Sequence, residues 1–168
     1  METEYNAEAL ATYIVRELER MFPSRPTGRS KLQKMFYLLS RKVHGNLRFD
    51  LFLNGPYSDQ VEKALGQAVE SGMLSAVKEN GRSNISARGG ITSKVPLDIQ
   101  GKADQCILAY GFYGEEDLAI LTTALFLEDC DILLPDELIK AVLAVNPRFD
   151  LRRVCSLLDR SDVVFRSW

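Results

Sequence analysis

The side chains that could do chemistry in this chain are few and far apart. His44 is the only histidine among the 168 residues, so a Ser-His-Asp or Cys-His arrangement would have to use it. It comes directly before Gly45 at the expected end of a helix, where a contact with the helix dipole is the simpler role. We therefore expect no catalytic residues and classify the protein as non-enzymatic.

Metal and cofactor motifs are also missing from the sequence. The three cysteines form no Cys-x-x-Cys pair, which most zinc sites contain, and no G-x-x-x-x-G-K-[ST] phosphate loop occurs. Glu128, Asp129 and Asp131 could hold a divalent ion, but a solvated helix end is the better interpretation of this acidic trio. We predict no metal and no cofactor.

The charge of the chain is segregated, although its formal net value is only −2. Residues 22–49 carry seven basic side chains and no acidic one, and residues 78–96 carry four basic side chains and one acidic. Residues 97–131 carry eight acidic side chains and one basic. This pattern predicts a basic surface built from the first two segments.

The first basic segment contains an amphipathic helix. At about 100° per residue, its lysines and arginines fall within roughly a 100° arc, opposite the apolar residues Leu32, Phe36 and Leu39. The arc could bind phosphates or an acidic protein, or it could be a solvated face neutralised by acidic helices of the same chain. The candidate binding face consists of Arg29, Lys31, Lys34, Arg41, Lys42, Tyr57, Ser58, Arg82, Arg88 and Lys94.

Helix, strand, helix is the expected order around this arc. The apolar spacing predicts helices over 6–21, 30–43 and 58–72, with Ser30 as the N-cap of the second. Residues 47–53 alternate as a strand, and residues 54–56 turn the chain into the third helix. Tyr57 and Ser58 then lie at a helix start, where backbone N–H groups can hold an anion or be capped by a side chain.

A change of periodicity follows at residue 74. Short apolar pieces and the turn pairs Asn80-Gly81 and Gly89-Gly90 predict a β-hairpin over 74–95. Helical spacing returns after Pro96, with helices expected over 99–110, 115–128, 135–145 and 150–158. We predict a mainly α fold, with a winged-helix-like N-terminal part (1–96) and a C-terminal helical bundle (97–168) packed on it as one compact unit.

Four sequence motifs carry a family resemblance. They are, in order, KLQKMFYLLS, FLNGPYSDQVEKALGQAVESGML, EEDLAILTTALFLED and NPRFDLRRVCSLL. With them the chain resembles the YwgA-like family of bacterial and archaeal proteins over most of its length. More distantly, the first two motifs resemble Panacea-type antitoxin domains, which share a KLQK-type helix followed by a G-P-[YV] turn. The resemblance implies an α-rich fold with a winged-helix-like part and no assigned catalytic residues.

Two functions fit these observations. The first is a regulatory or antitoxin-like module that binds another protein, such as a toxin or a nuclease. The alternative is a winged-helix nucleic-acid-binding protein that uses the basic arc and the hairpin. The third helix argues against simple operator binding, because Asp59, Glu62 and Glu70 on its polar side would repel phosphates.

The start of the chain and its apolar runs bear on its location. The first residues have no basic and apolar pattern of a secretion signal, and no apolar run reaches the roughly 18 residues that cross a bilayer. We therefore expect a cytoplasmic protein without a membrane partner.

Overall fold

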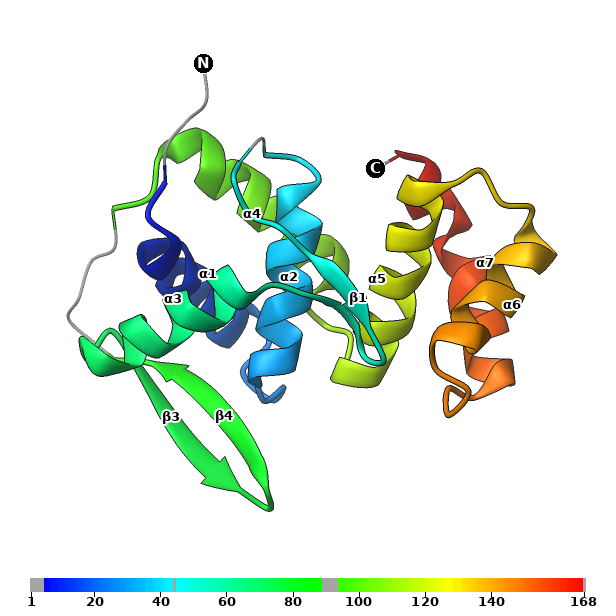
Figure 1. The fold of residues 1–168 in the computed structure, drawn as a ribbon. Helices are drawn as coiled ribbons and strands as arrows, with labels where there is room; N and C mark the ends of the chain where they lie inside the picture. Colours follow the sequence, from blue (N-terminus) through cyan, green and yellow to red (C-terminus); the bar gives the residue numbers. More distant parts are fainter. Residues whose placement is uncertain (1–4, 44, 89–93, 168) are drawn as a thin grey trace.

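The computed structural model describes residues 5–43, 45–88 and 94–167, with side chains up to Asp159. These residues form seven helices and two antiparallel hairpins (Figure 1), which confirms the predicted mainly helical class. In chain order the elements are α1 (Ala7–Met21), α2 (Arg29–Ser40), β1 (Asp50–Phe52), β2 (Gly55–Tyr57), α3 (Asp59–Glu70), β3 (Leu74–Glu79), β4 (Arg82–Ala87), α4 (Leu97–Tyr110), α5 (Glu115–Cys130), α6 (Pro135–Val145) and α7 (Leu151–Ser167).

The start of α2 differs from the prediction. Its N-cap is Gly28, and Ser30 lies inside the first turn, so Ser30 as N-cap is wrong. The reason is a tertiary contact: Gly28 forms an antiparallel bridge with Asn84 of β4, and the N–H of Ile85 donates to the carbonyl of Thr27 at 2.7 Å. This pairing keeps the chain extended up to Gly28, and the helix begins directly after it.

The segment between α2 and α3 is a short hairpin rather than one strand and a turn. Phe52 of β1 lies opposite Gly55 of β2, so the predicted turn at 54–56 is wrong and the chain reverses one residue earlier. Gly55 has a φ of +102°, and a Cβ there would lie 3.2 Å from Lys34 Cε and 3.3 Å from the carbonyl of Ala119. Glycine thus lets β2 pack closely against both α2 and α5.

The second hairpin projects from the body of the protein (Figure 1). β3 pairs with β4 from Leu74 opposite Ala87 to Glu79 opposite Arg82, which confirms the predicted hairpin over 74–87. Its predicted extension to residue 95 is wrong, because residues 88, 94 and 95 lie outside the strands. Asn80 and Gly81 both have positive φ, as a two-residue hairpin turn of type I′ requires. The second predicted turn pair, Gly89-Gly90, lies outside the described residues.

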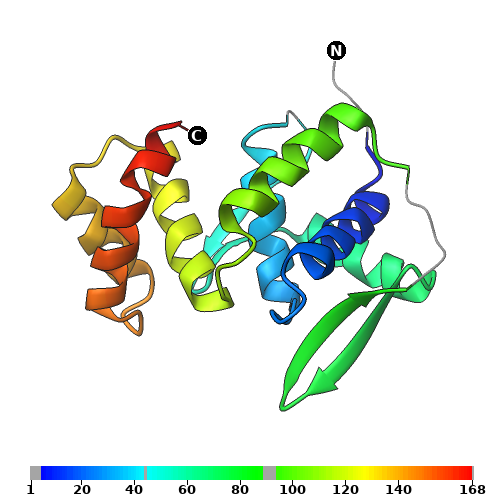
Figure 2. The ribbon, with the colours of Figure 1, turned by 180° about the vertical axis from the view of Figure 1, so that it is seen from behind.

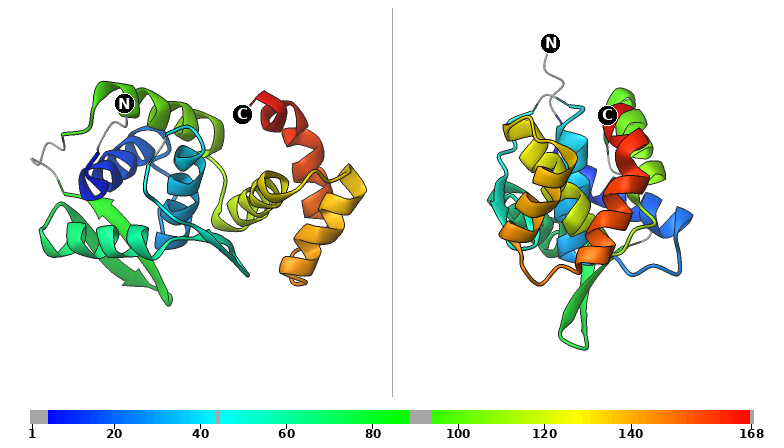
Figure 3. Two further views of the ribbon diagram at one scale, coloured as in Figure 1. Left: turned by 45° about the horizontal axis from the view of Figure 1, so that its top comes forward. Right: turned by 90° about the vertical axis from the view of Figure 1, so that its right-hand side faces the viewer.

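The helices pack around α2. α4 packs against α1 and α2 and lies in front of α2 in the view from behind (Figure 2), and α5 lies between α2 on one side and α6 and α7 on the other (Figure 3). Leu32, Phe36 and Leu39 are at most 3% exposed, which confirms the predicted apolar stripe of α2. α6 has the predicted bounds, whereas α7 continues to Ser167. The predicted division at residue 96 stays a prediction.

The length and apolar content of a helix decide whether it can cross a bilayer. Among the described residues, no helix has both the length and the apolar content that crossing a membrane requires.

Candidate binding groove

The basic arc of α2 is not an open face. Lys31 and Lys34 are only 2% and 3% exposed, so the expectation that they lie on a polar surface is wrong. All nine residues from Lys31 to Leu39 are buried, because α1, α3, α4, α5 and β2 enclose α2 on nearly every side. Reversing the charge of either lysine would therefore place an acid in the interior.

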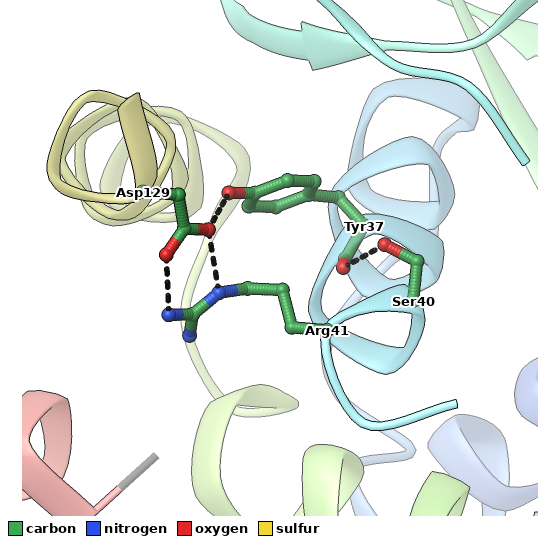
Figure 4. Close-up of polar contacts among 4 residues, drawn as sticks. All are labelled: Tyr37, Ser40, Arg41 and Asp129. Carbon is green, nitrogen blue, oxygen red and sulfur yellow. Dashed lines mark hydrogen bonds and ion pairs between the residues drawn. The ribbon is translucent and has the colours of Figure 1, made fainter. Parts of the chain in front are cut away.

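The other cations of the arc have partners in the same chain. Arg29 forms an ion pair with Glu62 of α3, and Lys42 Nζ donates to Gln105 Oε1 at 3.1 Å. Arg41 lies against the acidic end of α5, where it pairs with Asp129 (Figure 4). Of the two interpretations of the arc, these contacts favour neutralisation within the molecule for α2 itself.

Asp129 is therefore already engaged. Its carboxylate accepts hydrogen bonds from Arg41 Nε at 2.9 Å, Arg41 Nη2 at 3.0 Å and the Tyr37 hydroxyl at 3.0 Å (Figure 4). Burial and the neighbouring carboxylate raise the pKa of Tyr37 well above its ordinary value, so the phenol stays a donor. Among the described residues, no group of three or more His, Cys, Asp or Glu side chains could hold a metal.

The predicted site residues of the hairpin region remain open to solvent. Arg82, Arg88 and Lys94 are all exposed. Arg82 stands at the start of β4, and Arg88 and Lys94 flank residues 89–93, which lie outside the described part of the chain. The structure thus separates the predicted face into buried or paired cations on α2 and exposed cations around the second hairpin.

The start of α3 is closed by its own side chains. Ser58 is 1% exposed, and its Oγ accepts from the N–H of Val61 at 3.4 Å, which confirms capping rather than an open helix end. Gln33 of α2 bonds the Ser58 backbone twice, donating to its carbonyl at 3.0 Å and accepting from its N–H at 2.9 Å. Tyr57 is half-buried and faces a groove beside α2.

This groove, which we call the α2 groove, consists of two cavities that share Ser30 and Asn54 as lining residues. The polar half has a volume of about 760 Å³, and the apolar half about 590 Å³. Charged and amide side chains dominate the polar half, among them Arg25, Lys31, Arg82, Asn84, Glu115, Asn146 and Arg148. The apolar half is lined by Arg29, Gln33, Lys34, Phe52, Leu53, Gly55, Tyr57 and Glu62.

One buried lysine lies in each half. Lys31 Nζ donates to the carbonyl of Gly111 at 2.6 Å, at the C-cap of α4, where the helix dipole favours a cation. Lys34 Nζ has one hydrogen bond to a described residue, to Ser30 Oγ at 3.3 Å. Desolvation lowers the pKa of both lysines to about 8, and the charge of Glu115 opposes this shift. Both ammonium groups are therefore mostly charged at neutral pH.

The rim of the apolar half carries two exposed hydrophobic side chains. Phe52 is 56% exposed and Leu53 62% exposed, at the tip of the β1–β2 hairpin. Within the hairpin, the Phe52 ring packs edge-on against Tyr57 of β2 at 5.7 Å between centroids. From outside the hairpin, Asn146 Nδ2 at the C-cap of α6 donates to the Leu53 carbonyl at 3.1 Å. The site thus offers apolar groups on a braced hairpin next to a buried cation.

The sequence reasoning missed several groove residues. The strand predicted over 47–53 includes Phe52 and Leu53 and gives them no role at a hairpin tip. Apolar residues before the Asn54-Gly55 pair are a hairpin signal that could have placed them there. Glu115 is one of the acidic residues of segment 97–131, and no local signal predicts its contact with α2. His44, the one candidate base, lies outside the described residues.

The chain was compared with known proteins. No protein-family model matches it, and a search of curated proteins finds no significant match.

Proposed function

We propose that this chain is a non-enzymatic regulatory module of the antitoxin type, which binds another protein through the apolar half of the α2 groove. The observation that carries this proposal is the pair Phe52 and Leu53, which are exposed on a braced hairpin beside a cavity of about 590 Å³. Exposed apolar side chains that border a groove are typical of protein-binding sites. A toxin or a nuclease is the proposed class of partner, in line with the resemblance to Panacea-type domains.

The same proposal includes a winged-helix-like N-terminal part. Its support is the element order: α1, an extended bridge at Gly28, α2, the inserted β1–β2 hairpin, α3 and then the β3–β4 hairpin, to which the bridge adds a third extended segment. In this arrangement α3 would be the helix that reads DNA in a nucleic-acid-binding relative. Its solvent side carries Asp59 and Glu70, which favours a protein partner over a DNA groove.

Site-specific crosslinking tests the protein-binding proposal. A photoreactive benzoylphenylalanine replaces Leu53 in the cell, and crosslinked proteins are identified by mass spectrometry. The purified partner is then titrated by calorimetry against the wild type and the double variant Phe52→Ser, Leu53→Ser. We expect the variant to bind at least tenfold more weakly, because it loses the apolar anchors of the interface.

A matched control separates this site from general surface stickiness. Ile132, between α5 and α6, is 96% exposed, so Ile132→Ser removes an even more accessible hydrophobic side chain elsewhere. The control variant should bind the partner as the wild type does. Equal crosslinking yields from positions 53 and 132, or unchanged affinity of the double variant, would refute the proposal.

Nucleic-acid binding is the second candidate, favoured by the exposed cations Lys78, Arg82 and Arg88 on and beside the projecting hairpin. If these side chains contact phosphates, affinity for a mixed-sequence duplex should fall tenfold or more between roughly 50 and 200 mM salt. Lys78→Glu with Arg82→Glu should abolish that binding and leave the melting temperature unchanged. Fluorescence anisotropy with labelled duplex measures the salt dependence and the loss of binding, and thermal unfolding measures the melting temperature. Absence of wild-type binding at low salt would remove this candidate.

A further inference from the structure

We infer that the apolar half of the α2 groove recognises an acidic side chain on an extended segment of the partner protein, with Lys34 as the counter-ion of that carboxylate. This inference rests on the proposed function and specifies the chemistry of the bound segment. Apolar residues of the same segment would lie beside Phe52 and Leu53.

The two buried lysines of α2 differ in a way that points to Lys34. Lys31 has a structural role, because its ammonium holds the carbonyl that ends α4 at 2.6 Å. Lys34 is just as buried, yet its one hydrogen bond among the described residues is a long one, to the Ser30 hydroxyl. No described carboxylate lies within ion-pair distance of Lys34. Glu115 of α5 acts on Lys34 through its charge alone, because no ion pair or hydrogen bond joins the two side chains.

A buried ammonium without an ion-pair partner is costly for a folded protein. An ammonium has three donors, and leaving them without strong acceptors in a desolvated site opposes folding. Methionine or leucine would fill the same space next to Gly55 without that cost. A lysine at this position is therefore accounted for by an anion that arrives from outside.

The cavity also indicates what kind of anion fits. Arg29, the other cation of the apolar half, is already paired with Glu62, so a single positive charge remains for the ligand. One ammonium in an apolar groove matches a singly charged carboxylate better than a phosphate, which usually needs several cations or a cluster of N–H donors. The exposed Phe52 and Leu53 at the rim add area for apolar neighbours, which an isolated small carboxylate would not cover.

A peptide library provides the probe. The full chain is immobilised and screened against a synthetic library of end-blocked random heptapeptides. We expect the selected peptides to be enriched in Asp or Glu next to aliphatic or aromatic residues. The best peptide and its Asn or Gln counterpart are then compared by fluorescence anisotropy at pH 7, where we expect the acidic peptide to bind at least tenfold more tightly.

The dependence on pH adds a readout that a purely structural lysine would not change. Because the pKa of Lys34 in the free protein is about 8, affinity for the acidic peptide should fall about tenfold from pH 7 to pH 9. The amide peptide should show no such fall. Lys34→Met should bind both peptides alike at both pH values, and thermal melting checks that this variant is folded.

Lys31→Met is the matched control, since it removes an equally buried ammonium of similar pKa and should keep the discrimination between acid and amide. The inference is overturned by a selection without acidic enrichment, by a wild type that does not distinguish the two peptides, or by a Lys34→Met variant that still does. Benzoate that binds as tightly as the selected peptide would overturn the assignment to a protein segment.

These outcomes are separable from the proposed function. A cellular partner that crosslinks at position 53 but shows no need for an acidic residue leaves the proposed function in place and removes this inference. If acidic peptides bind selectively but no cellular partner crosslinks at position 53, the proposed function fails and the assignment of Lys34 as a carboxylate-binding group stays.

Discussion

Arg41 and Asp129 form a two-point ion pair that joins the C-terminal end of α2 to the C-terminal end of α5. The Tyr37 hydroxyl, one turn earlier on α2, bonds the same carboxylate. Arg41 supplies the positive charge of this ion pair, whereas the charge pattern of the sequence places Arg41 on the candidate binding face. The contact instead fixes α5, which supports α6 and α7, against the central helix of the fold.

Removing this carboxylate should loosen the contact between α2 and α5. Asp129→Ala leaves the half-buried Arg41 guanidinium and the Tyr37 hydroxyl without their acceptor, and we expect a loss of about 1–3 kcal/mol of unfolding free energy. Asp131→Ala is the control, because among the described residues that carboxylate accepts a hydrogen bond only from the N–H of the next residue. Urea denaturation of both variants checks this, and equal stabilities would contradict it.

Phe36 tests the core of α2. The side chain is 1% exposed, so Phe36→Ala should cost about 3–5 kcal/mol through lost burial and the cavity left behind. Leu108→Ala, on the solvent side of α4 at 65% exposed, should change stability by less than about 0.5 kcal/mol. A wild-type melting temperature for the Phe36 variant would show that the assigned core is wrong.

Gly28 tests the link between Glu115 and the two lysines. Its φ of −94° suits any residue, but an added Cβ would collide with the Glu115 carboxylate, which can swing away as the end of a flexible side chain. Because the charge of Glu115 raises the pKa of Lys31 and Lys34, Gly28→Ala should lower both values further below about 8.

NMR titration of ¹³C-labelled lysines measures this effect. Gly66→Ala in α3 is the control, because its Cβ would have no neighbour within 4 Å. That variant should leave both lysines unchanged and should raise stability by about 0.5–1 kcal/mol through its better helix propensity. Lysine pKa values that are the same in the Gly28 variant and the wild type would exclude the proposed electrostatic link.

Lys34 should make stability depend on pH in a definite direction. Burial lowers its pKa from 10.5 to about 8, so between these values the unfolded chain binds the proton more tightly than the folded one. The destabilising effect of the buried charge is therefore complete below pH 8 and is lost as the pH rises toward 10.5. Lys34→Met should be more stable than the wild type at pH 7, and the gap should narrow by about 1 kcal/mol per pH unit above pH 8.

Urea denaturation of the wild type and Lys34→Met at pH 7, 8, 9 and 9.5 gives the difference directly. Comparing the two proteins at each pH cancels the contribution of Cys106, whose pKa burial raises to about 12 and which therefore acts in the opposite direction above pH 9. A gap that stays constant with pH would show that Lys34 is uncharged or solvated in the folded protein.

Local sequence determined the elements and several of their ends. Apolar spacing and the proline at position 135 predict α6 with its observed bounds, and Ser58 caps α3 because a short side chain before a helix can accept from the third N–H. The Asn80-Gly81 pair likewise predicts the tip of the second hairpin, since it tolerates positive φ. These features depend on neighbours only a few residues apart.

Tertiary packing alone decided which charges are buried. A helical arc separates polar from apolar residues, but it contains no information on how many other elements surround the helix. α2 is enclosed on nearly every side, so Lys31 and Lys34 are buried although the arc predicts exposure. The α2 groove has the same origin, because Ser30, Asn54 and Glu115 come from separate segments that meet only once α5 has packed against α2.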